Sequence, residues 1–564
     1  MKFNHLNVPT HWKNYWTRYP EGHTILEALI SWVSQVDEMV DNQNTLNEKV
    51  DKFRNELDAF IGRFDDRLQE EVTKTLEDWQ ASGFIEAVIS SALQWELDDY
   101  KTTNEQDKVA INTQLQENVK RLNSFDLRTF PKFGPIDLSK FEGLQHNVTF
   151  DLWRDPADGI VKHNWKLNEA GYTNFYVSRS GSASNDGKTP QTPLSRLSLA
   201  LQKIEDDPSV SKAIINLTAP IDRVVVSITT ADKTLTKKYI IRSENPIASN
   251  QHISSYSTYS GSTVKGACAY EVFGVLRIDE TDEKGLPVSF KKASTIDECI
   301  ATPDSFFSDK TNVYINRADT SYENTYVLVN QQILQFKLGQ NAEVVLDNIT
   351  VLSGSSDQPL YFEGTSAITG DVVLNKVDLY NFGTGSSTNG VSTNAIRDIK
   401  SFYCRVFNIP RDGFNYHNTI SSGGTVFEYN CYAENVGLDS NQTGNNNIST
   451  GHEGVHILRV GTKGRSSQGP MIADVNGCYS ANIDVSVYDT GLTNMSTRLN
   501  SAYYFDDTSA VKPGKSWLVN CSGGGLTEFA INGDNSFRAD NKIYVDNFIG
   551  YNIPEDVHLT QFLI

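Results

Sequence analysis

The sequence contains no run of 18 apolar residues, so no transmembrane helix is predicted. Its first residues, MKFNHLNVPTHWKNYW, lack the apolar core of a signal peptide. We therefore expect a protein that is made in a cytoplasm, does not insert into a membrane, and reaches any external site by lysis or by assembly into a particle.

Positive charge is scarce. Lysine and arginine total 50 against 70 aspartates and glutamates, which gives a net charge of −20 at pH 7. Because a chain of this charge repels phosphate backbones, a nucleic-acid partner is not expected. At 564 residues the chain is also too long for one compact core, so about two to four domains are expected.

Cysteine is rare and shows no ligand spacing. The six cysteines form no CxxC pair, which excludes the common zinc motifs, and they do not follow the pattern of a small disulfide scaffold. We expect reduced, buried thiols that pack as small apolar side chains. A bridge between neighbouring cysteines of the repeat is the alternative.

Four short segments share one register: VDLYN (377–381), CRVFN (404–408), CYAEN (431–435) and CYSAN (478–482). The first three start 27 residues apart. Alternate strand positions share a face, so each segment has two inward positions and ends in an asparagine that can form a ladder. This period predicts a parallel β-helix, with chance similarity as the alternative. The three columns are Val377, Cys404, Cys431 and Cys478; Leu379, Val406, Ala433 and Ser480; and Asn381, Asn408, Asn435 and Asn482.

The N-terminal part has a different pattern. Residues 1–24 are aromatic and polar and are interpreted as a docking peptide, and residues 25–124 as a helical stalk. Ten of eleven heptad core positions in the stalk are apolar, which predicts a coiled coil, and their large aromatics suit a multi-stranded bundle. A single amphipathic helix packed on its own domain is the alternative. The core positions are Leu29, Trp32, Val36, Met39, Gln43, Leu46, Val50, Phe53, Leu57, Phe60 and Phe64.

The remaining boundaries follow from turn and strand signals. Residues 125–174 are expected to form a linker or small subdomain, 175–550 the β-helix, and 551–564 a closing segment. Within 175–204 an amphipathic helix is predicted to cover the open end of the solenoid, as terminal repeats require. Its apolar stripe is Leu197, Ala200, Leu201 and Ile204.

Two aspartates follow the strand segments at the same offset of 27 residues. Asp412 in IPRDGFNYH and Asp439 in VGLDS would lie roughly 5 Å apart on neighbouring rungs. Such a pair suits a retaining glycosidase, or a shared divalent cation, which leaves the cofactor unknown. The alternative is that both are turn residues.

A histidine-rich insertion adds further candidates. Residues 441–462 contain His452, Glu453, His456 and Arg459. HEGVH matches the zinc-protease pattern HExxH, but the motif requires a helix and the following ILRV favours a strand. We therefore predict a catalytic set of Asp412, Asp439, His417, His452 and Glu453, with imidazoles as general acids or bases.

Substrate contacts are predicted around this set. Arg459 could hold an anionic group such as phosphate. The aromatic residues Phe414, Tyr416, Tyr429 and Tyr432 could stack on sugars, and surface or packing roles are the alternative for the histidines. The predicted substrate-binding residues are Arg459, His456, Arg411, Tyr416 and Asp474.

These stretches resemble a known class of proteins. YVSRSGSASNDGKTPQTPLSRLSLAL is similar to the start of pectin-lyase-like solenoids. RDGFNYH, FEYNCYAENVGLDSNQTGNNNISTGHEGVHILRVG and ADVNGCYSANIDVSVYDTG resemble tail spike and appendage proteins of phages infecting Gram-positive bacteria, and so does the N-terminal helical segment. The resemblance implies a homotrimer that is attached through its N-terminus to other tail proteins of the virion.

The resemblance also implies a function and a site. Such proteins bind and often cleave cell-wall glycopolymers, teichoic acid among them, and the five catalytic candidates are carried over from the matching stretch. The sequence lacks a pectate-lyase set of calcium-binding carboxylates with an RxxR-like base, so uronate elimination is not expected.

The predicted fold class is mainly β: a right-handed parallel β-helix preceded by an α-helical coiled-coil stalk. Three functions remain open. The first is a depolymerase, either a teichoic acid phosphodiesterase or a glycoside hydrolase. The second is a trimeric adhesin that binds without turnover. The third is a structural spacer, which has no need for a histidine-rich insertion between two rungs.

Overall fold

The computed structural model describes most of the chain beyond residue 135. The predicted docking peptide, the coiled-coil stalk and Asp439 lie outside the described residues, so these predictions and the trimer stay untested. The described ranges are 136, 138–141, 150–155, 158–218, 222–229, 232–282, 287–317, 322–331, 333–354, 358–365, 369–382, 388–417, 424–437, 447–490, 501–507, 514–524, 529–533, 542–550, 553 and 557–561.

The described chain divides into two units. The smaller includes a two-stranded antiparallel hairpin of β1 (Leu152–Arg154) and β2 (Val161–His163). The larger contains the short helix η3 (Leu138–Lys140) and nearly all other described elements. No helix in the described ranges is long and apolar enough to span a membrane.

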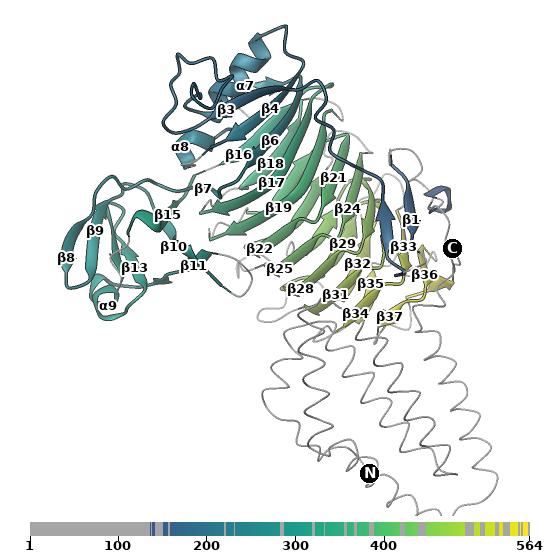
Figure 1. The fold of residues 1–564 in the computed structure, drawn as a ribbon. Coiled ribbons are helices and arrows are strands. Elements are labelled where there is room, and N and C mark those ends of the chain that lie inside the picture. Colours follow the sequence, from purple (N-terminus) through teal and green to yellow (C-terminus); the bar gives the residue numbers. More distant parts are fainter. Residues whose placement is uncertain are drawn as a thin grey trace, which may run out of the picture. The chain divides into compact units, whose positions relative to one another are not determined.

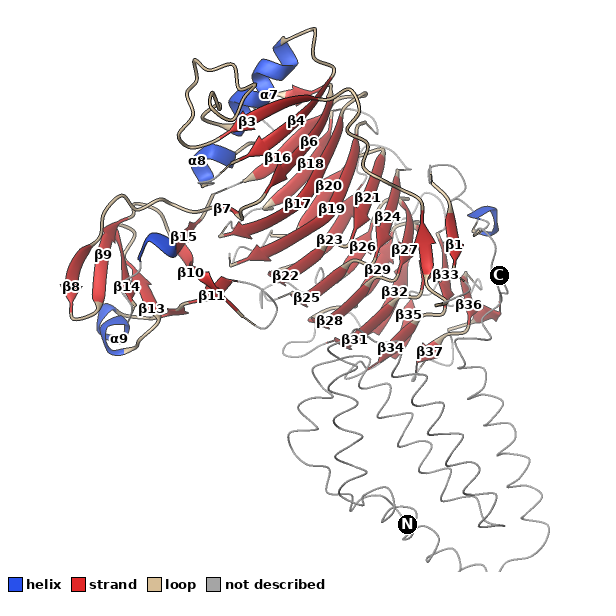
Figure 2. Ribbon diagram, in the orientation of Figure 1, coloured by secondary structure: helices blue, strands red, loops and turns tan. Residues whose placement is uncertain are grey.

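The larger unit is mainly β and is built from parallel strands stacked rung upon rung (Figures 1 and 2). One face is a nine-stranded sheet, called the flat sheet. It consists of β5 (Thr234–Leu235), β16 (Leu334–Leu338), β18 (Leu360–Gly364), β20 (Val391–Asn394), β23 (Phe414–His417), β26 (Ser449–Gly451), β29 (Ile472–Val475), β32 (Ser501–Asp506) and β35 (Phe529–Gly533).

A second, bent sheet completes each rung with two arms. The first arm contains β3 (Thr173–Val177), β4 (Lys212–Leu217), β6 (Lys238–Ser243), β21 (Asp398–Phe402), β24 (Thr425–Tyr429), β27 (His456–Val460), β30 (Tyr479–Ile483), β33 (Lys515–Val519), β36 (Ile543–Asp546) and β38 (Leu559–Gln561). The second contains β7 (Ile247–Ala248), β22 (Arg405–Ile409), β25 (Tyr432–Val436), β28 (Lys463–Ser467), β31 (Ser486–Thr490), β34 (Ser522–Gly524) and β37 (Ile549–Gly550). The long strands β17 (Glu343–Ser353) and β19 (Asp371–Asn381) run through both.

This arrangement is the one expected of a parallel β-helix. Successive chain segments pass from the flat sheet to the first arm and then to the second, and every rung pairs in parallel with the next. A continuous apolar core fills the interior, with Phe336, Phe362 and Val406 among its fully buried members. The mainly parallel β prediction is thus confirmed, while the hand of the coil stays a prediction.

The predicted register is confirmed for three of the four repeat segments. Asp378 pairs with Arg405 and Arg405 with Tyr432, each at an offset of 27 residues. Within the asparagine ladder, Asn435 Nδ2 donates to Asn408 Oδ1 at 3.2 Å.

The placement of the fourth segment is wrong. CYSAN lies at β30 in the first arm, so Cys478 does not stack on Cys431. The backbone pairing instead continues the cysteine column through Thr462, Val485 and Cys521. The physical reason is that loop lengths vary between rungs, so one short pattern can recur in a different arm. All six cysteines are buried and unbridged, as predicted.

Helices and an insertion complete the larger unit. Helix α7 (Leu197–Asp206) buries its predicted stripe of Leu197, Ala200, Leu201 and Ile204 against the core, next to the short α8 (Arg223–Val226). Between β7 and β16 the chain forms additional strands with a core of their own, which the sequence did not predict. The inserted strands are β8 (Ser257–Ser260), β9 (Thr263–Ala267), β10 (Val272–Thr281), β11 (Pro287–Ser289), β12 (Lys291–Lys292), β13 (Ser305–Ser308), β14 (Asn312–Asn316) and β15 (Thr325–Val329), and two short helices, α9 (Ile296–Ala301) and η4 (Tyr322–Asn324), lie among them.

Candidate functional site

Two histidines meet at the corner where the flat sheet turns toward the first arm. His417 is the last residue of β23, and His452 directly follows β26 on the next rung. The strand register places them in one column, because Tyr416 pairs with Gly451 and the His452 N–H donates to the Tyr416 carbonyl oxygen. Their rings stack with centroids 4.0 Å apart and planes within 8°.

A carboxylate joins this pair. Glu453 has a left-handed backbone (φ 53°), and its Oε2 lies 3.1 Å from His417 Nδ1. The side chains of His417 and Glu453 are 30% and 32% exposed, so both can contact a solute. A carboxylate at Nδ1 selects the tautomer with its proton there and leaves Nε2 as the base. The corner therefore presents an oriented imidazole base; His417, His452 and Glu453 are called the corner cluster.

The corner cluster also has metal-ligand chemistry. One ligand atom from each of the three residues lies within 4.8 Å of the other two, and two imidazoles with one carboxylate match the three protein ligands of catalytic zinc sites. However, the nearly parallel rings direct their nitrogen lone pairs side by side rather than toward one point. A metal held by both histidines requires one ring to rotate, so the observed geometry favours proton transfer.

Asp412 does not lie in this cluster. Its carboxylate is fully buried, and burial raises its pKa. Asn447 donates to Asp412 Oδ1 from its backbone N and its Nδ2, each at 2.9 Å, and Asn415 Nδ2 donates to Oδ2 at 2.6 Å. A carboxylate with no exposed surface cannot contact a polymer, so this geometry favours the turn role over the catalytic one. Because Asp439 lies outside the described residues, the proposed carboxylate pair has no measured distance.

Arg459 and Asp474 were predicted to bind substrate, and the structure shows that this is wrong. Both are buried in the solenoid interior, where Arg459 Nη1 and Nη2 donate to the two carboxylate oxygens of Asp474 at 2.9 and 2.8 Å. Burial opposes the charge of Arg459, but attraction to Asp474, the hydrogen bonds to it and attraction to Glu428 together outweigh burial and raise the pKa of the guanidinium. The reason for the misplacement is the direction of the side chain, which points inward from β27.

A second carboxylate extends this interior cluster. Glu428 is fully buried, and its Oε2 lies 3.8 Å from Arg459 Nε. Ser449 Oγ donates to Glu428 Oε1 at 2.6 Å, and Thr462 Oγ1 donates to Oε2 at 3.0 Å. The group is a hydrogen-bonded ionic cluster that joins several rungs from inside.

The other predicted contacts separate into buried and partly exposed residues. Tyr416 is fully buried, which raises the pKa of its hydroxyl well above the usual value. Arg411 and His456 are partly exposed, and the His456 ring packs edge-on against Tyr479. His456 begins strand β27, which confirms that HEGVH is not a helical zinc motif. None of these three belongs to the corner cluster.

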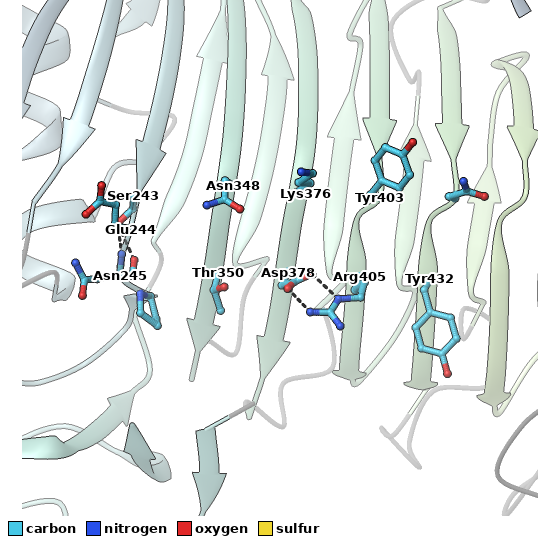
Figure 3. A pocket seen from close by; sticks show the side chains of 12 residues that line it. Ser243, Glu244, Asn245, Asn348, Thr350, Lys376, Asp378, Tyr403, Arg405 and Tyr432 are labelled. Carbon is cyan, nitrogen blue, oxygen red and sulfur yellow. Dashed lines mark hydrogen bonds and ion pairs between the residues drawn. The ribbon is translucent and has the colours of Figure 1, made fainter. Parts of the chain in front are cut away.

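An open groove at the bend of the bent sheet was not predicted. It has a volume of about 720 Å³ and follows the outer face across β17, β19, β22 and β25 (Figure 3). Tyr432, which the sequence did suggest as a sugar contact, lines it, whereas Phe414, Tyr416 and Tyr429 are buried. The recurrence of Asn, Asp or Gly marks the bend once the strand register is known, but it does not mark the groove.

No protein-family model matches the chain, and no curated protein sequence is significantly similar to it. Among solved structures, the chain is similar to one titled "Glycoside hydrolase" (TM-score 0.41, 10% identity, 68% of this chain and 98% of that chain). It is also similar to XylC in complex with xylose (0.36, 11%, 69% and 70%) and to the GH136 lacto-N-biosidase from Eubacterium ramulus (0.33, 10%, 86% and 68%). At these scores the likenesses carry no conclusion about function.

Proposed function

We propose that the chain is a receptor-binding tail appendage of a phage infecting Gram-positive bacteria, and that it binds and cleaves a cell-wall glycopolymer. The sequence resemblance supports the biological setting. The observation that carries the catalytic part is the corner cluster: a partly exposed imidazole, 3.1 Å from a carboxylate and stacked on a second imidazole. Trimer formation, attachment to other tail proteins through the N-terminus, and location on the virion belong to the same proposal.

The side chains at the corner favour a phosphodiester over a glycosidic bond. A glycosidase needs two carboxyl groups flanking the scissile bond, and among the described candidates only Glu453 is a partly exposed carboxylate, while Asp412 and Asp474 are buried. In the proposed reaction a water oxygen bonds to phosphorus while His417 Nε2 takes the water proton. The ester P–O bond breaks, and the protonated imidazole returns the proton to the departing alkoxide.

A non-catalytic adhesin is the second candidate. It is favoured by the groove at the bend, which is lined by Tyr403, Tyr432 and Asn430 but contains no histidine. In this reading the same polymer is held without turnover, and the histidine pair is a packing feature of the corner.

Incubation of the purified protein with Gram-positive cell walls and with isolated teichoic acid distinguishes these functions. We expect soluble phosphate esters to accumulate with time, without a matching rise in reducing ends. Reducing ends alone would indicate a glycosidase. Saturable pull-down with walls and no released product would leave the adhesin, and neither binding nor release would overturn both.

A further inference from the structure

From the rung of β17 to that of β36, the bend between the two arms is made on each rung by one residue with a left-handed backbone. Eight such residues stack in a column, with φ between 48° and 63°. Five are asparagine or aspartate and one is glycine, the types that adopt this conformation at least cost. The column consists of Asn348, Lys376, Tyr403, Asn430, Gly461, Asp484, Asn520 and Asn547.

Two consecutive members depart from this rule. Lys376 (φ 54°) and Tyr403 (φ 56°) occupy the column where its other members are Asn, Asp or Gly. A left-handed backbone is an outlier for a bulky side chain, and such strain persists where surrounding structure holds it, often at binding sites. Asparagine would satisfy the bend at both positions, as it does on the rungs at either side. The backbone conformation of the bend therefore does not explain why lysine and tyrosine occupy these two positions.

Both exceptions line the groove. Figure 3 shows Lys376 and Tyr403 on neighbouring strands, in line with Asn348. The side chain of Tyr403 is one of the few large exposed rings of the described chain, with 43% of the residue accessible. Its ring meets Tyr429 edge-on, with centroids 5.4 Å apart, which restrains its orientation. The strained positions thus present a cation and a fixed aromatic face to solvent.

A second row of groove residues runs parallel to the first. Thr350, Asp378, Arg405 and Tyr432 follow in register on four successive rungs. Arg405 Nε and Nη2 donate to the two carboxylate oxygens of Asp378 at 2.8 and 2.5 Å, so the opposite charges of these two side chains cancel. The lining also includes Glu244, so the groove as a whole carries no net charge, but Lys376 forms no ion pair with any described residue and places a positive charge beside the Tyr403 ring. Rungs repeat at about 4.8 Å, so the two rows offer a regular series of polar contacts to an extended chain.

We infer that this groove is a second, non-catalytic site for a sugar–phosphate polymer. The inference rests on the proposed function and adds where the polymer is held. Tyr403 stacks on a sugar ring, Lys376 pairs with the adjoining phosphate as a point charge, and the asparagine amides accept and donate to hydroxyl groups. The groove and the corner cluster lie at opposite ends of the first arm, whose five-residue strands span roughly 17 Å.

Replacing Tyr403 or Lys376 by asparagine, the commonest residue of the column, tests this inference. Tyr403→Asn should weaken binding of isolated teichoic acid about tenfold, the order expected for loss of one aromatic contact. Lys376→Asn should weaken it about threefold, as expected for an exposed ion pair, and should leave binding of an uncharged wall polysaccharide unchanged. Because asparagine relieves the bend, neither variant should lower the thermal unfolding midpoint, and a rise is expected.

The controls separate binding from folding. Tyr403→Phe keeps the ring and should bind like the wild type. Tyr259→Asn removes another exposed tyrosine, in the insertion, and should have no effect on binding. A lower unfolding midpoint in Tyr403→Asn together with unchanged polymer affinity would show a purely structural ring and overturn the inference. If the wild type itself binds no wall polymer, the proposed function fails; if it binds and both asparagine variants bind equally well, only the groove is wrong.

Discussion

Replacing Arg459 by methionine should lower the free energy of unfolding by about 3–5 kcal/mol, the usual loss when one partner of a buried ion pair is removed. The reason is that Asp474 and Glu428 would stay in the solenoid interior with no positive charge near them. The two hydrogen bonds to Asp474 would be lost as well. Urea unfolding of the full chain, followed by tryptophan fluorescence and by circular dichroism, measures this change.

A surface pair of the same residue types provides the matched control. Arg397 binds both carboxylate oxygens of Asp371 at 2.8 and 2.6 Å, but its side chain is 43% exposed. Arg397→Met should therefore change the free energy of unfolding by about 1 kcal/mol or less, since water solvates the carboxylate that remains. Equal losses in the two variants would contradict the view that Arg459 is a buried structural residue. Large loss of polymer binding without destabilisation would restore its predicted role as a substrate contact.

Replacing His417 by glutamine should lower polymer turnover by about 10²- to 10⁴-fold, the range for loss of a general acid–base group. Glutamine keeps the size of the side chain but cannot take up a proton at Nε2. The unfolding midpoint and the affinity for polymer should stay near wild type, because His417 is partly exposed and lies outside the groove. Product release at saturating polymer, measured together with binding, checks this.

His456→Gln is the control for His417, because His456 lies outside the corner cluster and packs on Tyr479. Its turnover should be unchanged. A chelator should also leave wild-type turnover unchanged, since the parallel rings of His417 and His452 do not converge on one ion. Loss of activity with chelator and recovery with added zinc would show that the corner cluster binds a catalytic metal.

The local, periodic part of the fold could be predicted from the sequence. The offset of 27 residues gave the true register of β19, β22 and β25, and the apolar stripe of α7 gave its buried face. These signals survive because each depends on neighbours within one rung or one helix. The insertion between β7 and β16 was not predicted because its mostly antiparallel strands have the same short alternating pattern as the solenoid strands.

The site was only partly predictable. His417, His452 and Glu453 were named together, and the stacking of adjacent rungs explains their contact. Arg459 was misjudged because its charge suggested the surface. A signal against this was present, since Arg459 is two positions from the buried Ile457 on the same strand and therefore shares its inward face. The groove depends on backbone φ at Lys376 and Tyr403, which no local pattern reveals.

Hydrogen exchange of the His417→Gln variant, with and without isolated teichoic acid, tests whether a wall polymer is held and cleaved on the solenoid itself. This variant should bind the polymer but cleave it about 10²- to 10⁴-fold more slowly than the wild type. We expect slower exchange on polymer binding at the bend, in 376–378, 403–405 and 430–432, and at the corner around 452–453. Protection confined to the insertion at 257–329, or none at saturating polymer, would contradict this expectation.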